Sequence, residues 1–169
     1  MKVFIPIRST EILNDEVKNS ILNQSEKADI ELIVTTPSFQ LKRKGEFEAR
    51  DLIVNKANNL LDKYVVVNDS DTSHLYNNNF KHMIEFLNNN EKVGAVVLWN
   101  SIIKFKEPIV HYRLACTMFR TEILKQMPQL NIEGSDFNKC CCIRYKQKIE
   151  ELGYQISYID DIKRISELK

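Results

Sequence analysis

Apolar residues along the chain follow two patterns that alternate. Short continuous apolar runs between polar or turn-forming residues predict buried strands, because both faces of such a strand pack against other elements. Stretches with apolar residues every three or four positions predict amphipathic helices. The expected strands are residues 3–7, 31–35, 64–67, 92–99 and 154–159, and the expected helices are 46–62, one beginning near residue 73, and 135–152.

Residues that favour helix ends mark several further boundaries. Ser9 or Thr10 can cap a helix after the first strand, with apolar positions at Ile12, Leu13, Val17, Ile21 and Leu22. Thr121 is expected to cap a short helix, and Gly153 is placed to end the last helix. Before Thr121, residues 101–119 are rich in β-forming residues and predict a hairpin or meander.

This alternation of strands and helices predicts an α/β fold with a sheet between two layers of helices. The first strand, the helix after it and the second strand form a βαβ unit, in which the two strands are parallel. The length of 169 residues fits one domain spanning residues 1–169 and suffices for a sizeable core. In such sheets, ligands bind beyond the carboxyl ends of the strands.

Composition excludes several classes of protein. With 43% hydrophobic residues, 24 basic against 23 acidic residues and a net charge of +1, the chain is typical of a soluble globular domain and shows no basic excess for nucleic-acid binding. Its densest basic stretch, residues 42–44, is expected to be a solvated loop. The N-terminal apolar run is too short for a signal peptide, and no segment approaches 18 apolar residues, so we expect a cytoplasmic protein without a transmembrane segment.

The four cysteines match neither a disulfide framework nor a paired zinc-binding motif, since three of them, Cys140, Cys141 and Cys142, are consecutive and Cys116 is remote. Consecutive side chains on a helix point about 100° apart. At least one of the three is therefore expected to face the core and at least one to face outward. We expect reduced thiols that serve packing and hold no stoichiometric zinc.

Asp69-Ser70-Asp71 is the most informative polar motif, because it directly follows the apolar strand 64–67. Two carboxylates at this spacing can bind one hard divalent cation, Mn²⁺ or Mg²⁺, and leave positions open for the oxygens of a diphosphate. The same residues are also common in polar turns and helix caps, which is the alternative interpretation. The nearby His74 and His82 are expected at the surface.

Several segments in this order resemble a known family. They are Phe4-Ile5-Pro6-Ile7-Arg8-Ser9, residues 21–24, 31–34, Glu48-Ala49-Arg50-Asp51, Tyr64 to Asp71, residues 111–120, Glu133-Gly134-Ser135-Asp136-Phe137, and residues 151–156. Together, over residues 3–159, they resemble the nucleotide-binding half of family-two glycosyltransferases with the GT-A fold. The resemblance implies a GT-A-like three-layer α/β/α sandwich with a mostly parallel central sheet.

The resemblance also implies a donor site for a nucleotide sugar. Asp71, together with Asp69, would hold Mn²⁺ or Mg²⁺ on the diphosphate, and Asp69 would also approach the ribose. Pro6 and Arg8, at the end of the first strand, would border the base, and Arg50 would lie near the nucleotide.

On the acceptor side, the resemblance implies a general base, Asp136 or else Glu133. A carboxylate suits this role, because it can deprotonate a sugar hydroxyl, or another hydroxyl, as that oxygen attacks the anomeric carbon. The expected outcome is inversion at that carbon.

Three functions follow as hypotheses. The first is a small metal-dependent glycosyltransferase, and its alternative is a catalytically inactive GT-A-like module that binds nucleotides or glycans or serves assembly. The alternative is motivated by the short chain and by the lack of any histidine after His111. A sugar nucleotidyltransferase is less favoured, since residues 8–11 contain no glycine to form a phosphate-binding loop.

Overall fold

The computed structural model describes residues 1–35, 42–99, 116–132 and 140–160. Six strands form one sheet in the order β2-β1-β3-β5-β4-β6. Their bounds are β1 Lys2–Arg8, β2 Asp29–Thr35, β3 Tyr64–Asn68, β4 Val93–Trp99, β5 Cys116–Arg120 and β6 Gln155–Asp160. The strands expected from the apolar runs are therefore present at nearly the expected positions.

The sheet is mostly parallel, as predicted. β1 pairs in parallel with both β2 and β3, and β4 pairs in parallel with β6. β5 lies between β3 and β4 and is antiparallel to both of them. The start of β5 consequently lies beside the end of β3, where Cys116 is in register with Asn68.

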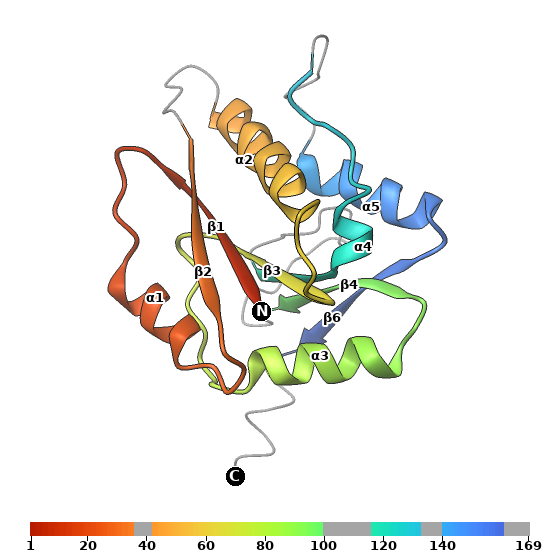
Figure 1. Ribbon diagram of the computed structural model, residues 1–169, viewed down its shortest axis with the longest axis horizontal. Helices are drawn as coiled ribbons and strands as arrows, with labels where there is room; N and C mark the ends of the chain where they lie inside the picture. The colour runs from red at the N-terminus through yellow and green to blue at the C-terminus, as the bar shows by residue number, and fades with distance from the viewer. Residues whose placement is uncertain (36–41, 100–115, 133–139, 161–169) are drawn as a thin grey trace, which may run out of the picture.

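Helices cover both faces of the sheet, which confirms the three-layer α/β/α architecture (Figure 1). α1 (Asp15–Leu22) and α3 (Asn79–Asn89) lie on one face. α2 (Lys42–Ala57), α4 (Thr121–Leu124) and α5 (Cys141–Glu151) lie on the other. Each face has its own hydrophobic core.

The two cores follow from the alternation of side chains along β1 and β3. Successive side chains of a strand point to opposite faces of the sheet. Phe4 and Val67 therefore belong to the core under α2, α4 and α5, whereas Ile5 and Val66 belong to the core under α1 and α3. All four are at most 1% exposed, so these central strands are buried on both faces.

The start of the first helix differs from the prediction. Asn14, and neither Ser9 nor Thr10, caps α1, because its side-chain oxygen accepts a hydrogen bond of 2.7 Å from the backbone N–H of Glu16. The chain before Asn14 is a loop in which Ile12 is 95% exposed. Ile12 is thus not part of the apolar face of α1.

The helix that was predicted to begin near residue 73 also begins later, at Asn79. The intervening segment crosses to α1, where the His74 backbone N–H donates to Ser20 Oγ and the Tyr76 carbonyl accepts from Gln24 Nε2. These long-range hydrogen bonds replace the helical ones. They could not be inferred from the local pattern.

β2 differs from the predicted buried strand, because it lies at the edge of the sheet. Ile33 is buried, whereas Leu32 and Val34, which point to the opposite face, are 43% and 55% exposed. An apolar run can therefore be half-exposed where it forms an edge strand.

The helix boundaries and the strand predicted for the C-terminal part of the chain are confirmed in part. Gly153 follows α5 with a φ of +82°, a conformation that favours glycine, and β6 begins two residues later. Arg120 occupies the cap position of α4, and Thr121 is the first residue of that helix instead of its cap. The helix predicted over 135–152 begins at Cys141 in the described part, while residues 135–139 and most of the predicted hairpin lie outside it.

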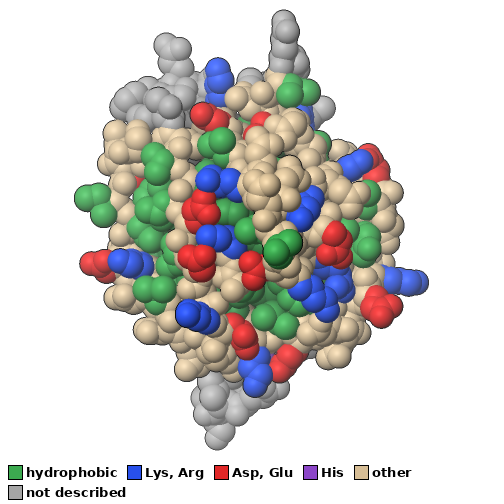
Figure 2. All heavy atoms as spheres, in the orientation of Figure 1, with side chains coloured by type: hydrophobic (Ala, Val, Ile, Leu, Met, Phe, Trp, Pro, Cys, Tyr) green, Lys and Arg blue, Asp and Glu red, His purple; other side chains and the backbone are tan. Residues whose placement is uncertain are grey.

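The surface shows basic and acidic side chains interspersed over the face seen in Figure 2, in keeping with the nearly balanced charge. Among the described residues, none of the helices has the length and apolar character needed to span a bilayer.

Candidate functional site

The acidic loop, residues 69–72, leaves the sheet at the carboxyl end of β3. Phe4 of β1 is in register with Val67 of β3, and β3 ends one residue later at Asn68, whereas β1 continues to Arg8. Asp69 and Asp71 therefore lie beyond the carboxyl end of β3, where its parallel neighbour β1 extends further. This is the part of an α/β sheet where ligands are expected.

Asn68 holds the backbone of the acidic loop in place. Its side-chain amide donates two hydrogen bonds of 2.9 Å, one to the carbonyl oxygen of Asp69 and one to that of Thr72. The Thr72 N–H also donates to the Asp69 carbonyl, at 3.1 Å, which closes the turn. Because Asn68 is fully buried, these bonds are shielded from water.

His74 in turn fixes the orientation of Asn68. The amide nitrogen of Asn68 is a donor, so its Oδ1 must accept the 3.0 Å bond from His74 Nε2, which assigns the proton of the imidazole to Nε2. His74 Nδ1 then accepts from Asn79 Nδ2 at 3.2 Å. His74 is buried, contrary to the surface position expected from the sequence, and burial lowers its pKa to about 4.

Arg50 of α2 brings a positive charge to Asp69. Its Nη2 lies 3.1 Å from Asp69 Oδ1. The side chain of Arg50 is 9% exposed and that of Asp69 is 37% exposed, so the pair extends from the core to the surface. Burial is the largest effect and opposes the charge of Arg50, but Asp69 and the neighbouring Cys141, Tyr145 and Cys142 together outweigh it, so the pKa of Arg50 stays above its ordinary value.

Asp69 titrates at an unusual pH for a carboxyl group. Burial raises its pKa to about 6, Arg50 acts in the opposite direction, and the negative charge of Asp71 raises it further. Asp71 itself is exposed, with Thr72 Oγ1 3.5 Å from its Oδ1. The two carboxylates therefore repel one another, and a cation bound between them would relieve the repulsion.

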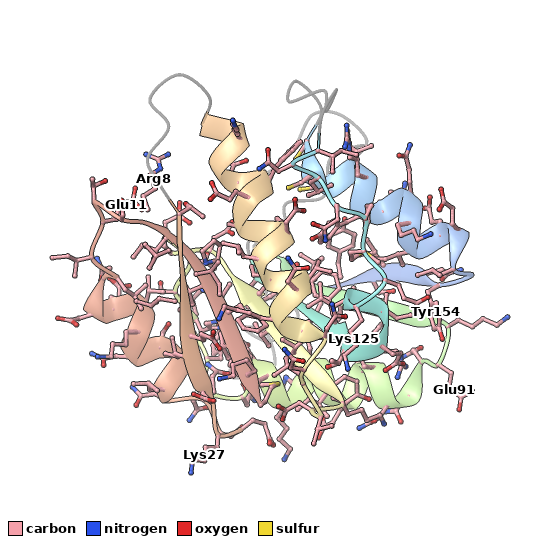
Figure 3. All side chains as sticks on the ribbon, turned by 45° about the horizontal axis from the view of Figure 1, so that its top comes forward. Arg8, Glu11, Lys27, Glu91, Lys125 and Tyr154 are labelled. Atoms are coloured by element: carbon pink, nitrogen blue, oxygen red, sulfur yellow. The ribbon has the colours of Figure 1, made fainter. Side chains whose placement is uncertain are left out.

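The residues predicted to border the base are less closely tied to this site. Pro6 is half-buried within β1 and in register with Ile33 of β2. Arg8 is exposed at the end of β1 and its Nη1 lies 3.6 Å from Glu11 Oε1 (Figure 3). The structure thus joins Arg50 to Asp69 by a direct contact, and it pairs Arg8 with Glu11.

The predicted general bases, Asp136 and Glu133, lie outside the described residues. The chain that leads towards them is held by Asp51, which sequence reasoning left without a role. Asp51 accepts backbone hydrogen bonds from Leu130 at 2.7 Å and from Asn131 at 2.8 Å, one on each carboxylate oxygen. Adjacent residues of α2 therefore bind two different segments of the chain, Arg50 the acidic loop and Asp51 residues 130–131.

Sequence reasoning also missed Asn68 and His74. The signal for Asn68 was available, because a polar residue at the end of a buried strand needs hydrogen-bond partners. No comparable local signal marks His74, whose partners come from β3 and α3.

Comparison with known proteins identifies similar structures but no matching sequence family. No family model matches the chain, and no curated protein matches it. Among solved structures, the chain is similar to the mannosyltransferase PcManGT from Pyrobaculum calidifontis in complex with GDP-Man and Mn²⁺, with a TM-score of 0.67 and 13% identity over 95% of this chain and 55% of that chain. It is also similar to S. aureus TarS 1–349 in complex with UDP-GlcNAc, with a TM-score of 0.63 and 12% identity over 95% and 56% of the two chains.

A third similar structure is a CMP:2-keto-3-deoxy-manno-octonic acid synthetase in complex with CTP. Its TM-score is 0.55 at 12% identity, and the match covers 94% of this chain and 88% of that one. At these identities the similarity concerns the fold, and the chain has the fold of GT-A glycosyltransferases. It spans about half the length of PcManGT and of TarS 1–349.

The buried neutral His74 predicts a loss of stability in mild acid. The folded-state pKa of about 4 lies below the ordinary value of 6.5, so the unfolded chain binds the proton more readily. This contribution is complete above about pH 6.5 and is lost as the pH falls towards 4, by up to about 3 kcal/mol. Urea unfolding of the wild type and His74→Gln across this range measures it, and the variant should show a smaller dependence on pH. An equal dependence in both proteins would contradict the assignment.

Proposed function

We propose that this chain is the nucleotide-sugar-binding domain of a metal-dependent glycosyltransferase. The observation that carries the proposal is the pair Asp69 and Asp71 at the carboxyl end of β3, with Asp69 held by Arg50. The fold supports the proposal, because similar structures include a mannosyltransferase crystallised with GDP-Man and Mn²⁺.

The acidic loop fits a hard divalent cation. Mn²⁺ and Mg²⁺ prefer oxygen ligands, and Asp69 and Asp71 supply carboxylate oxygens within one loop. The ion pair with Arg50 uses Asp69 Oδ1, so Oδ2 can bind a cation without breaking the pair. When bound, the cation would neutralise the negative charge that develops on the departing nucleoside diphosphate.

The protein's own groups would position the donor. Arg50 would orient the Asp69 carboxylate, Asp71 would complete the cation site, and Asp69 would also approach the ribose. Pro6 and Arg8, at the end of β1, would border the base. For Arg8 this requires its exposed ion pair with Glu11 to open, which costs little because surface pairs contribute about 1 kcal/mol or less.

On the acceptor side, Asp136 or Glu133 would take the proton of the attacking hydroxyl. An inverting displacement needs this base on the face of the sugar opposite the diphosphate. Asp51 would support this side of the site through its hydrogen bonds to residues 130–131.

The experiments below also test two other functions. One is a catalytically inactive module that binds a nucleotide or glycan. The other is a sugar nucleotidyltransferase, since the similar structures include a CMP:2-keto-3-deoxy-manno-octonic acid synthetase in complex with CTP. It is disfavoured by the lack of glycine in residues 8–11. A nucleotidyltransferase would release diphosphate from CTP and a sugar substrate, which a glycosyltransferase would not do.

Asp71→Ala should abolish the metal dependence of nucleotide-sugar binding. Calorimetry with GDP-Man and UDP-GlcNAc, in Mn²⁺ and in EDTA, should show tighter binding with Mn²⁺ in the wild type. The variant should lose roughly tenfold or more of the affinity in Mn²⁺, about 1.4 kcal/mol, with little loss of fold stability because Asp71 is exposed.

Asp62→Ala is the matched control, since Asp62 is also an exposed carboxylate but lies before β3 and contacts the N-terminal amino group. Asp69→Ala is a poorer test, because it would leave the buried charge of Arg50 without its partner and destabilise the fold. Equal affinity of the wild type in EDTA and Mn²⁺ would count against the cation site.

Metal-dependent binding should also weaken in mild acid. With a pKa of about 6, Asp69 is mostly ionised at pH 7 and mostly protonated at pH 5. The Mn²⁺-dependent affinity for a nucleotide sugar should therefore fall by about tenfold between these pH values. A nucleotide sugar is the suitable probe, because its doubly esterified diphosphate does not titrate in this range. Affinity that stays constant from pH 7 to pH 5 would show that the Asp69 carboxylate is not required.

Asp136→Asn separates an enzyme from a binding module. A group that acts only as general base contributes in the transition state, so the variant should lose about a hundredfold or more in turnover and retain its donor affinity. The measurement is sugar transfer or slow donor hydrolysis. Full activity in Asp136→Asn would move the role to Glu133, and nucleotide binding without any turnover in the wild type would favour the module.

A further inference from the structure

The thiols of Cys140, Cys141 and Cys142 converge instead of diverging. Their three Sγ atoms lie within 4.8 Å of one another, and Cys140 Sγ donates to Cys142 Sγ at 3.2 Å. The sequence-based expectation assumed that all three residues are helical. Cys140 is instead the cap residue of α5, with φ −65° and ψ 138°, and this extended backbone turns its side chain back towards the other two.

We propose that these three cysteines form a binding site for a thiophilic divalent cation such as Zn²⁺, with ligands other than those of the acidic loop. Zinc binds thiolates at about 2.3 Å, which places tetrahedral sulfur ligands roughly 3.8 Å apart. Cys140 Sγ and Cys142 Sγ are 3.2 Å apart and no separation in the cluster exceeds 4.8 Å, so small side-chain rotations suffice to reach that geometry.

The surroundings of the cluster suit bound thiolates. Three thiolates and one Zn²⁺ carry a net charge of −1, and the buried guanidinium of Arg50 interacts with Cys141 and Cys142. The thiols also lie at the N-terminus of α5, which favours negative charge, and Figure 1 shows this end of α5 beside α2. α2 and α5 also contact one another where Arg144 of α5 lies over the ring of Phe47 of α2.

Without a cation, Cys141 and Cys142 favour the protonated thiol. Hydrogen bonding among the thiols, together with burial, raises the pKa of Cys141 and of Cys142. Binding would then proceed by exchange, with three S–H bonds lost, three S–Zn bonds formed and three protons released to the solvent. No oxidant or reductant takes part.

Tyr145 provides a second, independent observation. Its side chain is 1% exposed, and its hydroxyl is one of the buried polar atoms of the described chain that have no hydrogen-bond partner. Tyr145 lies one helical turn after Cys141 and Cys142, with which it interacts electrostatically. The position of Tyr145 therefore places a buried polar group near the cluster.

The described residues supply three sulfur ligands and no fourth His, Cys, Asp or Glu within the group. These three sulfurs would fill three of the four positions of a tetrahedral cation. The sulfur cluster and the acidic loop differ in ligand chemistry, soft in one and hard in the other, so each should select its own cation.

The test is a titration of the reduced full chain with Co²⁺, a spectroscopic substitute for Zn²⁺. We expect one Co²⁺ per chain, with sulfur-to-cobalt charge-transfer absorption that disappears when Zn²⁺ displaces the cobalt. Cys142→Ser and Cys140→Ser should each abolish or strongly reduce the absorption. The second variant guards against misfolding, because Cys140 is only half-buried.

Two controls keep this result separate from the proposed function. Asp71→Ala should retain the absorption and the zinc stoichiometry, and Cys116→Ser should retain them as well, since Cys116 lies on β5 away from the cluster. Absence of thiolate absorption in the wild type would overturn the proposal, as would absorption that survives both cluster variants or is lost in Asp71→Ala.

Discussion

The ion pair between Arg50 and Asp69 links a helix layer of the fold to the acidic loop at the end of β3. Arg50 projects from α2, which covers one face of the sheet, and Asp69 belongs to the loop that continues β3. A charge buried as deeply as that of Arg50 is tolerated only with a partner, so the fold holds Asp69 against α2. The same guanidinium lies near the sulfur cluster at the start of α5.

Two buried polar groups determine the shape of the acidic loop. Asn68 binds both ends of the turn, and His74 determines which way the Asn68 amide faces. Such a network is stable only if each member has its partner, because an unpaired polar group inside a protein is costly. Asp71 is therefore exposed, while the buried Asn68 holds the backbone of its loop in place.

The two candidate ligand sites differ in the origin of their groups. The carboxylates of the acidic loop are separated by a single residue, so a short motif marks them. The sulfur cluster also comes from neighbouring residues, but its convergence depends on Cys140 lying just before the helix. A shift of the helix start by one residue would direct the thiols apart.

The sequence alone determined the layered α/β architecture, the positions of most strands and the location of Asp69 and Asp71 at a strand end, because apolar periodicity and strand length are local properties. It did not determine that β2 lies at an edge, that Asn14 caps α1 or that α3 begins at Asn79, since each depends on contacts with distant residues. The contact of Arg50 with Asp69, the burial of His74 and the convergence of the three thiols were decided only by the tertiary structure. In each case, the distance between the groups depends on how the helices pack on the sheet and on where each helix begins. The pattern of residues along the chain records neither of these.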